Sequence, residues 1–492
     1  MLQRANLDVI VVGGGAAGLV AAAGCAALGA RTALVERHRL GGECTWSGCV
    51  PSKSLLHIAR QAARLREAET LGIHAESLSI DAEQVMRSVR ATRQNIYDHG
   101  ESPAYLKQLG IRPLNASARF LDANRLEIER DGRRRELTFR SAIVATGSRP
   151  FIPEISGLDE IVYLTTDTLF EINAIPDRLA ILGGGATGVE MAQAFARLGS
   201  TVTVITRDDQ LLPGMDADAA AVLLAALRRD GVTVQFRSTI SSTRKSGDDI
   251  SITIDGVAEP TTLPADRLLI ATGRIANTDG LGLDAAGIAY DRRGIEVDAY
   301  CRTNVRHILA SGDVTPAPNL THVAEDMSKA AAINALARLP VQKYETEIIP
   351  RVIYTDPEVS TVGKTRSDLD SQGINYDVIE LPYDRIDRAV IEHQAAGFVR
   401  IYHRFGRVLG ATIVGAQAGE LIAEYAIAMK HDLPLPSLSG TMHAYPTMML
   451  GARRTADQFY VRMLKPWMVR GFQLLYGHRG DIPDFIGTRT IV

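Results

Sequence analysis

The apolar and glycine positions of the chain follow one pattern twice, and each time they predict a buried strand, a tight turn and a helix. The first copy has a strand at 8–12 and a helix that continues to about 28. The second copy has a strand at 179–182 and a helix at 189–198. The turns carry Gly13, Gly15 and Gly18 in the first copy and Gly183, Gly185 and Gly188 in the second. Adding 170 to the first three numbers gives the second three, so the chain repeats one supersecondary unit.

The turn glycines have the spacing of a dinucleotide-binding site. In the first copy the next strand, 32–35, ends at Glu36, which lies 18 residues after Gly18. A GxGxxG sequence alone is weak evidence, but between a strand and a helix, and followed by an acid, it predicts a pyrophosphate on the helix N-terminus. Glu36 would then accept a hydrogen bond from a ribose hydroxyl, whereas an ordinary α/β core needs neither feature.

The second copy differs at the position of the ribose-binding acid. The same offset carries Glu36 onto Thr206, and Arg207 follows directly. An acid here would bond the ribose 2′-hydroxyl of NAD and repel a 2′-phosphate, whereas a neutral Thr beside an Arg suits NADP. We therefore expect NADP rather than NAD at this unit. The alternative is that Arg207 is an ordinary solvated side chain at the end of a strand.

Two cysteines, Cys44 and Cys49, lie five positions apart with Gly48 between them. The spacing allows the Cα separation of roughly 4.4–6.8 Å that a disulfide requires, because Gly48 lets the backbone turn. Pro51 and the apolar periodicity after it predict a helix that starts just behind Cys49. The positive end of that helix, with Lys53 one turn in, favours a thiolate at Cys49.

A zinc site is the alternative use of these thiols. Structural zinc sites usually separate two cysteines by about two to four residues and need a second pair of ligands, which Cys25 and Cys301 do not form. The sequence therefore favours a redox-active dithiol over a metal site or two unrelated thiols, and it predicts no resident metal.

The segment Gly41-Gly42-x-Cys44-x4-Cys49-Val-Pro-Ser-Lys53 resembles the active-site segment of the flavin-dependent pyridine nucleotide–disulfide oxidoreductases. This is the group of lipoamide dehydrogenase, glutathione reductase and mercuric reductase. The resemblance covers almost the whole chain and implies an α/β fold with two Rossmann-like dinucleotide-binding domains and a C-terminal α+β dimerisation domain. In chain order it implies the first part of the FAD-binding domain (1–150, with a helical insertion at about 55–110), the NAD(P)-binding domain (151–275), the second part of the FAD-binding domain (276–345), the dimerisation domain (346–464) and a C-terminal extension (465–492).

By the same resemblance, FAD binds the first unit and NADPH the second, and electrons pass from NADPH through FAD to the dithiol and on to an acceptor. Cys49 is implied to face the flavin as a thiolate, and Cys44 to be the interchange thiol that meets the substrate. Lys53 and Glu190 match positions that form an ion pair beside the flavin, so Lys53 also counts as a cofactor-binding residue. The family's motifs further imply cofactor contacts at Gly42, Thr146, Gly147, Gly273, Gly312 and Asp313, the last as a ligand of the flavin ribityl chain.

The C-terminal proton-transfer motif departs from that of the disulfide-reducing members. They present a His followed five residues later by a Glu, whereas this chain has Tyr445 and Leu450 there. A phenol has an unperturbed pKa of about 10 and is a poor base at neutral pH, and Leu cannot orient it. Tyr445 is nevertheless the catalytic candidate of this segment, because His443, two residues earlier, is a lone histidine of the kind that is usually structural.

Mercuric reductases carry a Tyr at this point, which makes them the members that the chain resembles most. Their terminal cysteine pair is absent, however, since the chain ends Arg-Thr-Ile-Val at 489–492. The expected acceptor is therefore a small disulfide, a soft metal ion or a quinone. One alternative is a dihydrolipoamide dehydrogenase that uses NAD. Another, of a different class, is a non-catalytic flavoprotein that senses redox state, against which the intact Cys44, Cys49, Lys53 and Glu190 argue.

Composition narrows the partners and the compartment. Lys and Arg number 54 against 57 Asp and Glu, so the net charge of −3 gives no reason to expect nucleic acid as a partner. Four cysteines in 492 residues fit a reducing cytoplasm better than a secreted disulfide scaffold. The uncharged stretch 9–30 could be mistaken for a signal peptide or a membrane span, but its glycines fit the strand–turn–helix unit. We expect a soluble, cytoplasmic protein without a transmembrane span, and the resemblance adds that it is a homodimer.

Residues 465–492 extend past the usual end of the family's sequence. Apolar side chains alternate there with cations: Trp467, Met468, Phe472, Leu474, Leu475 and Tyr476 with Lys465, Arg470 and Arg479. The pattern allows a helix at a membrane interface or a tail packed on the partner subunit, and we expect the tail.

Overall fold

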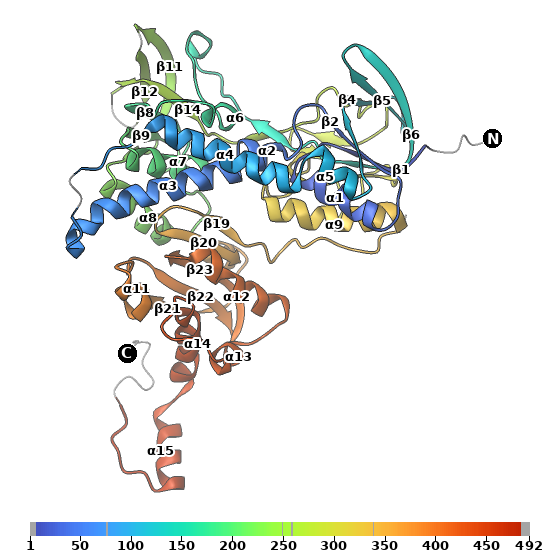
Figure 1. The fold of residues 1–492 in the computed structure, drawn as a ribbon. Helices are drawn as coiled ribbons and strands as arrows, with labels where there is room; N and C mark the ends of the chain where they lie inside the picture. Colours follow the sequence, from blue (N-terminus) through green and yellow to red (C-terminus); the bar gives the residue numbers. More distant parts are fainter. Residues whose placement is uncertain (1–5, 75–76, 248, 257–258, 338, 484–492) are drawn as a thin grey trace. The chain divides into compact units, whose positions relative to one another are not determined.

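A computed structural model (Figure 1) describes residues 6–74, 77–247, 249–256, 259–337 and 339–483. Contacts between residues divide the chain into two units. Unit 1 comprises Met1–Asp209 and Gly231–Thr346, and unit 2 comprises Gln210–Asp230 and Glu347–Val492.

The first sheet of unit 1 has the strand order β3-β2-β1-β6-β5-β4, with β18 beside β6. β1, β2, β3, β6 and β18 pair in parallel, and β4 and β5 form an antiparallel extension. The strands are β1 (Leu7–Val12), β2 (Thr32–Glu36), β3 (Arg112–Asn115), β4 (Ser117–Phe120), β5 (Arg125–Arg130), β6 (Arg133–Val144) and β18 (Ile308–Ala310). Through β18, residues far along the chain return to the sheet that holds the first glycine turn.

Helices cover this sheet and extend beyond it. α1 (Ala16–Ala27) and α9 (Thr321–Ala337) pack against each other and against β1 and β6. The helical stretch predicted after the two thiols is α3 (Cys49–Glu67), a 3-10 turn (Ala68–Leu71), α4 (Ala82–Gly100) and α5 (Pro103–Gln108). The first residue of α5 is Pro103, a residue type that is favoured in the first turn of a helix.

The second sheet repeats the first on a smaller scale. Its order is β10-β9-β8-β14, with all pairs parallel, and α7 packs on it. The elements are β8 (Arg178–Leu182), α7 (Ala186–Arg197), β9 (Thr201–Ile205), β10 (Thr233–Gln235) and β14 (Arg267–Ile270). α7 begins three residues before the predicted start, because the third turn glycine lies inside its first helical turn.

The other elements of unit 1 connect and flank the two sheets. An antiparallel sheet consists of β11 (Thr239–Ser246), β12 (Asp249–Asp255) and β13 (Thr261–Ala265). The shorter elements are α2 (Gly42–Trp46), β7 (Ser148–Pro150), a 3-10 turn (Leu158–Glu160), α6 (Thr166–Leu169), β15 (Arg274–Ala276), β16 (Tyr290–Asp291), β17 (Gly294–Ile295) and a 3-10 turn (Gly312–Val314). β7 pairs with β15, so the segments that follow β6 and β14 meet each other.

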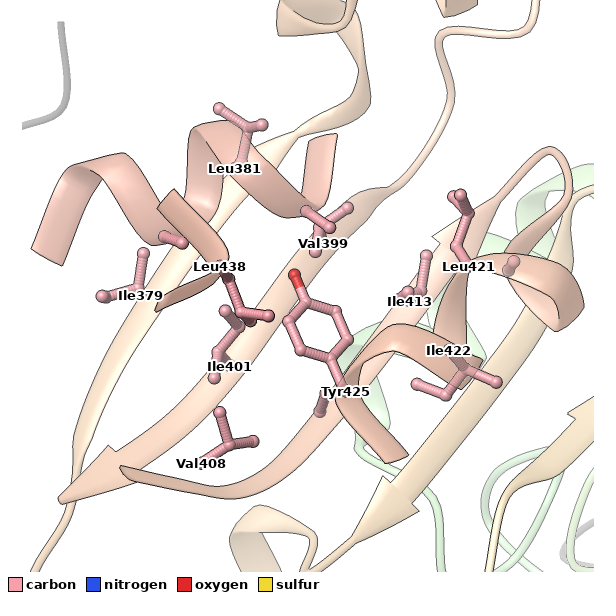
Figure 2. Close-up of a cluster of buried hydrophobic side chains, with 14 of the residues drawn as sticks. Ile379, Leu381, Val399, Ile401, Val408, Ile413, Leu421, Ile422, Tyr425 and Leu438 are labelled. Atoms are coloured by element: carbon pink, nitrogen blue, oxygen red, sulfur yellow. The ribbon is translucent and has the colours of Figure 1, made fainter. Parts of the chain in front are cut away.

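Unit 2 is an α+β unit around one antiparallel sheet, with strand order β19-β20-β23-β22-β21. Its strands are β19 (Arg351–Ile353), β20 (Glu358–Gly363), β21 (Asp377–Pro382), β22 (Phe398–Arg404) and β23 (Arg407–Gly415). Its helices include α10 (Arg366–Ser371), a 3-10 turn (Tyr383–Arg385), α11 (Asp387–Ile391), α12 (Ala418–Lys430), α13 (Leu435–Gly440), α14 (Leu450–Met463) and α15 (Pro466–Tyr476). Figure 2 shows the core, in which Tyr425 of α12 lies among Val399, Ile401 and Ile413 of the sheet.

One helix from the middle of the sequence belongs to unit 2. α8 (Ala217–Arg229) lies within the predicted NAD(P)-binding domain by sequence, but polar contacts hold its N-terminus against β22. The buried Arg400 donates to the carboxylates of Asp218 and, at 2.7 Å, Glu380. The hydroxyl of Tyr402 donates to Asp216 at 2.5 Å. Because each buried charge has a partner of opposite sign, the cluster tolerates burial.

The longest helices described, α3 and α4, have 19 residues each and carry charged side chains along their length. Within the described ranges, no helix combines the length and the apolar character that crossing a bilayer requires.

Candidate active site

A short helix, α2, and the start of the long helix α3 place Cys44 and Cys49 close together. Cys44 lies in α2, the chain turns at Ser47 and Gly48, and Cys49 is the first residue of α3. Cys49 is exposed and Cys44 is half-buried. The other two cysteines are buried elsewhere, and burial raises the pKa of Cys25 and of Cys301 to about 12.

A threonine far away in the sequence completes the thiol cluster. Thr321, the first residue of α9, has its hydroxyl oxygen 3.3 Å from the Cys49 sulfur and 3.5 Å from the Cys44 sulfur. The pKa of Cys49 is lowered to about 6, chiefly by a hydrogen bond from the Cys44 thiol, with help from Thr321 and Lys53 and against the effect of burial. The same hydrogen bond and burial raise the pKa of Cys44. The pair therefore holds one proton, on Cys44, and a thiolate at Cys49.

The ion pair implied by the family resemblance is present. Lys53 Nζ of α3 lies 2.8 Å from Glu190 Oε2 of α7, and the Glu190 side chain is almost fully buried. Lys53 lowers the pKa of Cys49 while Glu190 raises it. The pair thus links the dithiol helix to the helix of the second glycine turn.

A chain of polar contacts that the sequence did not reveal joins the dithiol segment to Asp313. The carboxylate of Glu43 accepts from Arg274, whose Nε donates to Ser148 Oγ at 2.8 Å. Ser148 Oγ in turn donates to Asp313 Oδ2 at 2.9 Å. Burial raises the pKa of Glu43 to about 7, against the effect of Arg274, and burial also raises the pKa of Asp313. These contacts connect Asp313, the residue expected to hold a ribityl group, to Glu43, which precedes Cys44 in the sequence.

α4 fixes the segment between the two thiols. Arg93 donates from one guanidinium nitrogen to the Trp46 carbonyl oxygen at 2.6 Å, and the Trp46 ring packs 5.2 Å from that of Tyr97. The hydroxyl of Thr45 donates to Glu101 at 2.8 Å, and burial raises the pKa of that carboxyl. These contacts give the helical insertion a definite task, which is to hold α2 in one position.

The first glycine turn forms a cradle that has no room for side chains. Gly13 has a φ of 108°, and a methyl group there would overlap the Ala145 carbonyl, while one on Gly18 would overlap the Gly13 carbonyl. Gly42, with a φ of 57°, lies against the Cα of Gly15. Gly15 caps α1 without a side-chain acceptor, so the first N–H groups of the helix are available to a pyrophosphate.

The residues around this turn fit FAD. Glu36 accepts from Gly14 N and from His38 N, each at 2.7 Å, so its carboxylate is fixed at the end of β2. Thr146 donates to the Asn277 carbonyl at 2.8 Å. Gly147 has a φ of 67°, and Gly312, with a φ of 74°, lies between Ala17 and Ala324. The expected FAD-binding positions of unit 1 therefore converge on one end of the first sheet.

The second glycine turn repeats this geometry. Gly183 has a φ of 125°, and a methyl group on it would overlap the Ala271 carbonyl, while one on Gly188 would overlap the Gly183 carbonyl. Gly185 caps α7, whose first turn contains no acid, and Gly273 follows β14 with a φ of 131°. Together these positions fit the pyrophosphate of a second dinucleotide.

The end of β9 contains an acid that sequence reasoning overlooked. Thr206 is buried and its hydroxyl lies 3.3 Å from Asp208 Oδ2, while Arg207 is exposed. The Thr206 hydroxyl is therefore engaged within the chain. A cation and a carboxylate stand next to each other where the ribose of the second dinucleotide is expected.

In unit 2, Tyr445 and His443 lie in different surroundings. Tyr445 is 69% exposed, and a hydrogen bond with Asp387 raises the pKa of its phenol. His443 is half-buried, although its side chain is only 7% exposed, with Nδ1 2.9 Å from the Thr441 carbonyl oxygen and Nε2 3.1 Å from Glu424. Both ring nitrogens of His443 have partners, which agrees with a structural role.

Comparison with known proteins gives consistent matches along the chain. Residues 7–328 match the family described as pyridine nucleotide-disulphide oxidoreductase, and residues 349–453 match its dimerisation domain. A dihydrolipoyl dehydrogenase from Haloferax volcanii is 36% identical over 92% of this chain and 95% of its own length. A mercuric reductase from Bacillus cereus is 31% identical over 91% of this chain and 70% of its own length. These identities give no support to the expectation that mercuric reductases are the most similar members.

Solved structures agree in fold. LpdA from Mycobacterium tuberculosis superposes with a TM-score of 0.85 at 28% identity, covering 92% of this chain and 99% of the other. The Cu(II) complex of RclA, an HOCl-induced flavoprotein disulfide reductase from Escherichia coli, gives 0.83 at 25% identity, covering 92% and 100%.

Proposed function

Because the chain belongs to the pyridine nucleotide-disulphide oxidoreductase family, and is thus an FAD-dependent disulfide oxidoreductase, we propose that it carries electrons from NADPH to the Cys44–Cys49 pair and on to an acceptor other than a common disulfide substrate. The observation that carries the proposal is the thiol cluster itself, in which Cys44 donates to a Cys49 thiolate. FAD, when bound, supplies the coupling between hydride transfer and thiol chemistry.

The protonation of the pair fits a two-electron donor. Reducing a disulfide to one thiol and one thiolate takes two electrons and one proton, which is what one NADPH delivers as hydride. Cys44 would keep the proton and Cys49 the negative charge, which agrees with the raised pKa of Cys44 and the lowered pKa of Cys49. Thr321 stabilises the thiolate, and Lys53, held by Glu190, adds a nearby positive charge.

The proposed class of acceptor follows from the surroundings of Tyr445 in unit 2. If the family's dimer forms, Tyr445 of one subunit faces Cys44 of the other, and a phenol bonded to Asp387 does not supply a base at neutral pH. Acceptors that need no protonation of a leaving thiolate, namely soft metal ions and quinones, should suffer least. The mercuric reductase relative and the Cu(II) complex of RclA support this class of acceptor.

NADPH is proposed because Arg207 is exposed at the end of β9, where it can reach a 2′-phosphate. A second candidate is a dihydrolipoyl dehydrogenase that uses NAD. Two observations favour it: the 36% identity to a dihydrolipoyl dehydrogenase, and the Asp208 carboxylate beside Thr206. We further propose the domain bounds given above, a homodimer formed through the dimerisation domain, and a cytoplasmic location.

One assay separates these functions. Turnover of the purified holoenzyme is measured with NADPH or NADH against lipoamide, glutathione disulfide, Hg(II) and a quinone. The proposal expects NADPH with Hg(II) or the quinone to be fastest, whereas NADH with lipoamide being fastest would establish the second candidate. Flavin reduction by either nucleotide that takes minutes would favour a non-catalytic redox sensor.

A further inference from the structure

Among the residues that the structure describes, α15 leaves most of its large apolar side chains exposed. None of its residues, Pro466–Tyr476, is buried. Trp467 is 72% exposed and Leu474 is 87% exposed. The other exposed large apolar side chains of the helix are Phe472, Leu475 and Tyr476. A helix with this much exposed apolar surface is stable in water only when something covers it.

The preceding helix, α14, also carries exposed apolar side chains. The first turns of α14 are anchored to the sheet of unit 2, since Gly451, Ala452 and Ala456 are buried. Its last turn also contacts the sheet, through Arg462, which donates to the Val378 carbonyl oxygen of β21, but Tyr460, Val461 and Met463 are exposed. Only Leu464 and Lys465 separate this turn from α15. Exposed apolar side chains therefore lie on both sides of this two-residue connection.

The place of α15 in the chain indicates which molecule covers its apolar side chains. α14 begins inside the region that matches the dimerisation domain, 349–453, and α15 follows directly after it. Other exposed apolar side chains of that domain are Met442, Tyr445 and Ile427. Large aromatic and aliphatic side chains at the edge of a dimerisation domain have the composition of an interface core.

The charge pattern speaks against a bilayer as the occupant. A helix lying at a membrane interface has a strongly charged polar face opposite its apolar one. α15 has a single charged residue, Arg470, and no acid. Its polar side, formed by Arg470 and Gln473, is narrow, whereas the apolar residues occupy most of the circumference, as in a helix enclosed by protein.

We propose that α15 is an arm that packs on the second copy of this chain in the dimer, with Trp467, Phe472, Leu474, Leu475 and Tyr476 as the contact residues. Two-fold symmetry makes the contact reciprocal, so each subunit gives one arm and receives one. The inference rests on the proposed homodimer, and the experiment therefore reads dimer formation and arm contact separately.

The test places a photo-crosslinking amino acid at position 475, on the apolar face, and, as a matched control, at position 470 on the polar side. Light scattering first reports the mass of each variant. Irradiation of the variant at 475 is expected to give a covalent species of twice the 53.2 kDa chain mass, with the crosslinked peptide mapping between subunits. The variant at 470 is expected to give at least tenfold less.

A dimer that crosslinks only within one chain, or not at all, would overturn the arm and leave the dimer intact. A monomer by light scattering would instead contradict the dimer on which both rest. Leu474→Gln combined with Leu475→Gln is expected to raise the dimer dissociation constant at least tenfold, with Arg470→Gln changing it less than twofold. Sedimentation of the wild-type dimer with phosphatidylserine-containing vesicles, lost in the double variant, would assign α15 to the membrane and refute the proposal.

Discussion

The hydroxyl oxygen of Thr321 lies 3.3 Å from the sulfur of Cys49, although 272 positions separate the two residues in sequence. Thr321 starts α9, and Cys49 starts α3. Two helix N-termini therefore meet at one sulfur, and each contributes partial positive charge in addition to the hydroxyl. This arrangement makes Thr321 a positioning and charge-stabilising residue for the thiolate, and it can be tested.

Replacing Thr321 with Val removes the hydroxyl while keeping the shape of the side chain. A hydrogen bond to a charged group contributes about 1.5–3 kcal/mol, so the pKa of Cys49 is expected to rise by about one unit or more. The measurement is the pH dependence of thiol alkylation by iodoacetamide in the reduced protein. Thr321→Ser, which keeps the hydroxyl, serves as the control. An unchanged midpoint in Thr321→Val would show that the contact does not stabilise the thiolate.

The pKa of Cys49, lowered to about 6, sets the pH range of the reduced enzyme. The thiolate predominates above that pKa and is lost as the pH falls through it, so thiolate-dependent absorption at long wavelength is expected to be nearly constant from pH 8 to 7 and to fall steeply below about 6. Cys49→Ala should abolish this absorption.

Cys44→Ala should keep the absorption but move its midpoint upward, because the largest cause of the lowered pKa is the hydrogen bond from Cys44. Cys25→Ala, which removes a buried thiol outside the cluster, is the matched control and should leave the titration unchanged. Absorption that persists in Cys49→Ala would reverse the assignment of the two thiols.

Local patterns in the sequence were sufficient for the parts of the fold that depend on neighbouring residues. The glycine turns gave β1, α1, β8 and α7, because a positive φ and the absence of Cβ are properties of single positions. Long-range contacts were missed. The Glu43–Arg274 pair joins residues 231 positions apart, and it exists only because β7 and β15 pair between the two sheets.

The second nucleotide site also contains a contact that the sequence pattern did not reveal. The offset of 170 aligned Glu36 with Thr206 correctly, and both lie at the end of a parallel strand. It could not show that the Thr206 hydroxyl is bonded to Asp208, because that contact depends on the turn after β9. We therefore expect Arg207 and Asp208 to act in opposite directions on nucleotide preference.

Arg207→Ala is expected to weaken the binding of NADPH by about 1–3 kcal/mol, which is the loss that follows removal of a charge-assisted contact. The binding of NADH should stay nearly unchanged. Asp208→Asn should act in the opposite sense and improve NADPH, because it removes a negative charge near the 2′-phosphate. The measurement is kcat/KM for each nucleotide with a fixed acceptor. If the NADPH/NADH ratio stays the same in Arg207→Ala, specificity lies elsewhere.

The last prediction concerns Tyr445. Its phenol is exposed, and its hydrogen bond with Asp387 raises its pKa, so even less phenolate is present at neutral pH than in a free tyrosine, and it cannot replace a His as a proton shuttle. General acid–base catalysis contributes about 10²–10⁴ in rate, and its absence is expected to slow turnover of lipoamide and glutathione disulfide by a factor in that range. Turnover of Hg(II) and quinones, which release no thiolate, should not be slowed in this way.

Comparing the wild type with Tyr445→Phe shows what the hydroxyl itself does. Loss of Hg(II) or quinone turnover in Tyr445→Phe, with the slow lipoamide rate unchanged, is expected if the phenol contacts the acceptor rather than moving protons. Tyr445→Phe removes only the hydrogen bond between Tyr445 and Asp387. Asp387 keeps its bonds to Arg454 at 3.0 and 3.2 Å, so the fold of unit 2 should be preserved. Wild-type lipoamide turnover on the order of 10² s⁻¹, which is within the ordinary range for enzymes, would refute the hypothesis. The search for another base would then begin at His443, whose bond to Glu424 would have to open.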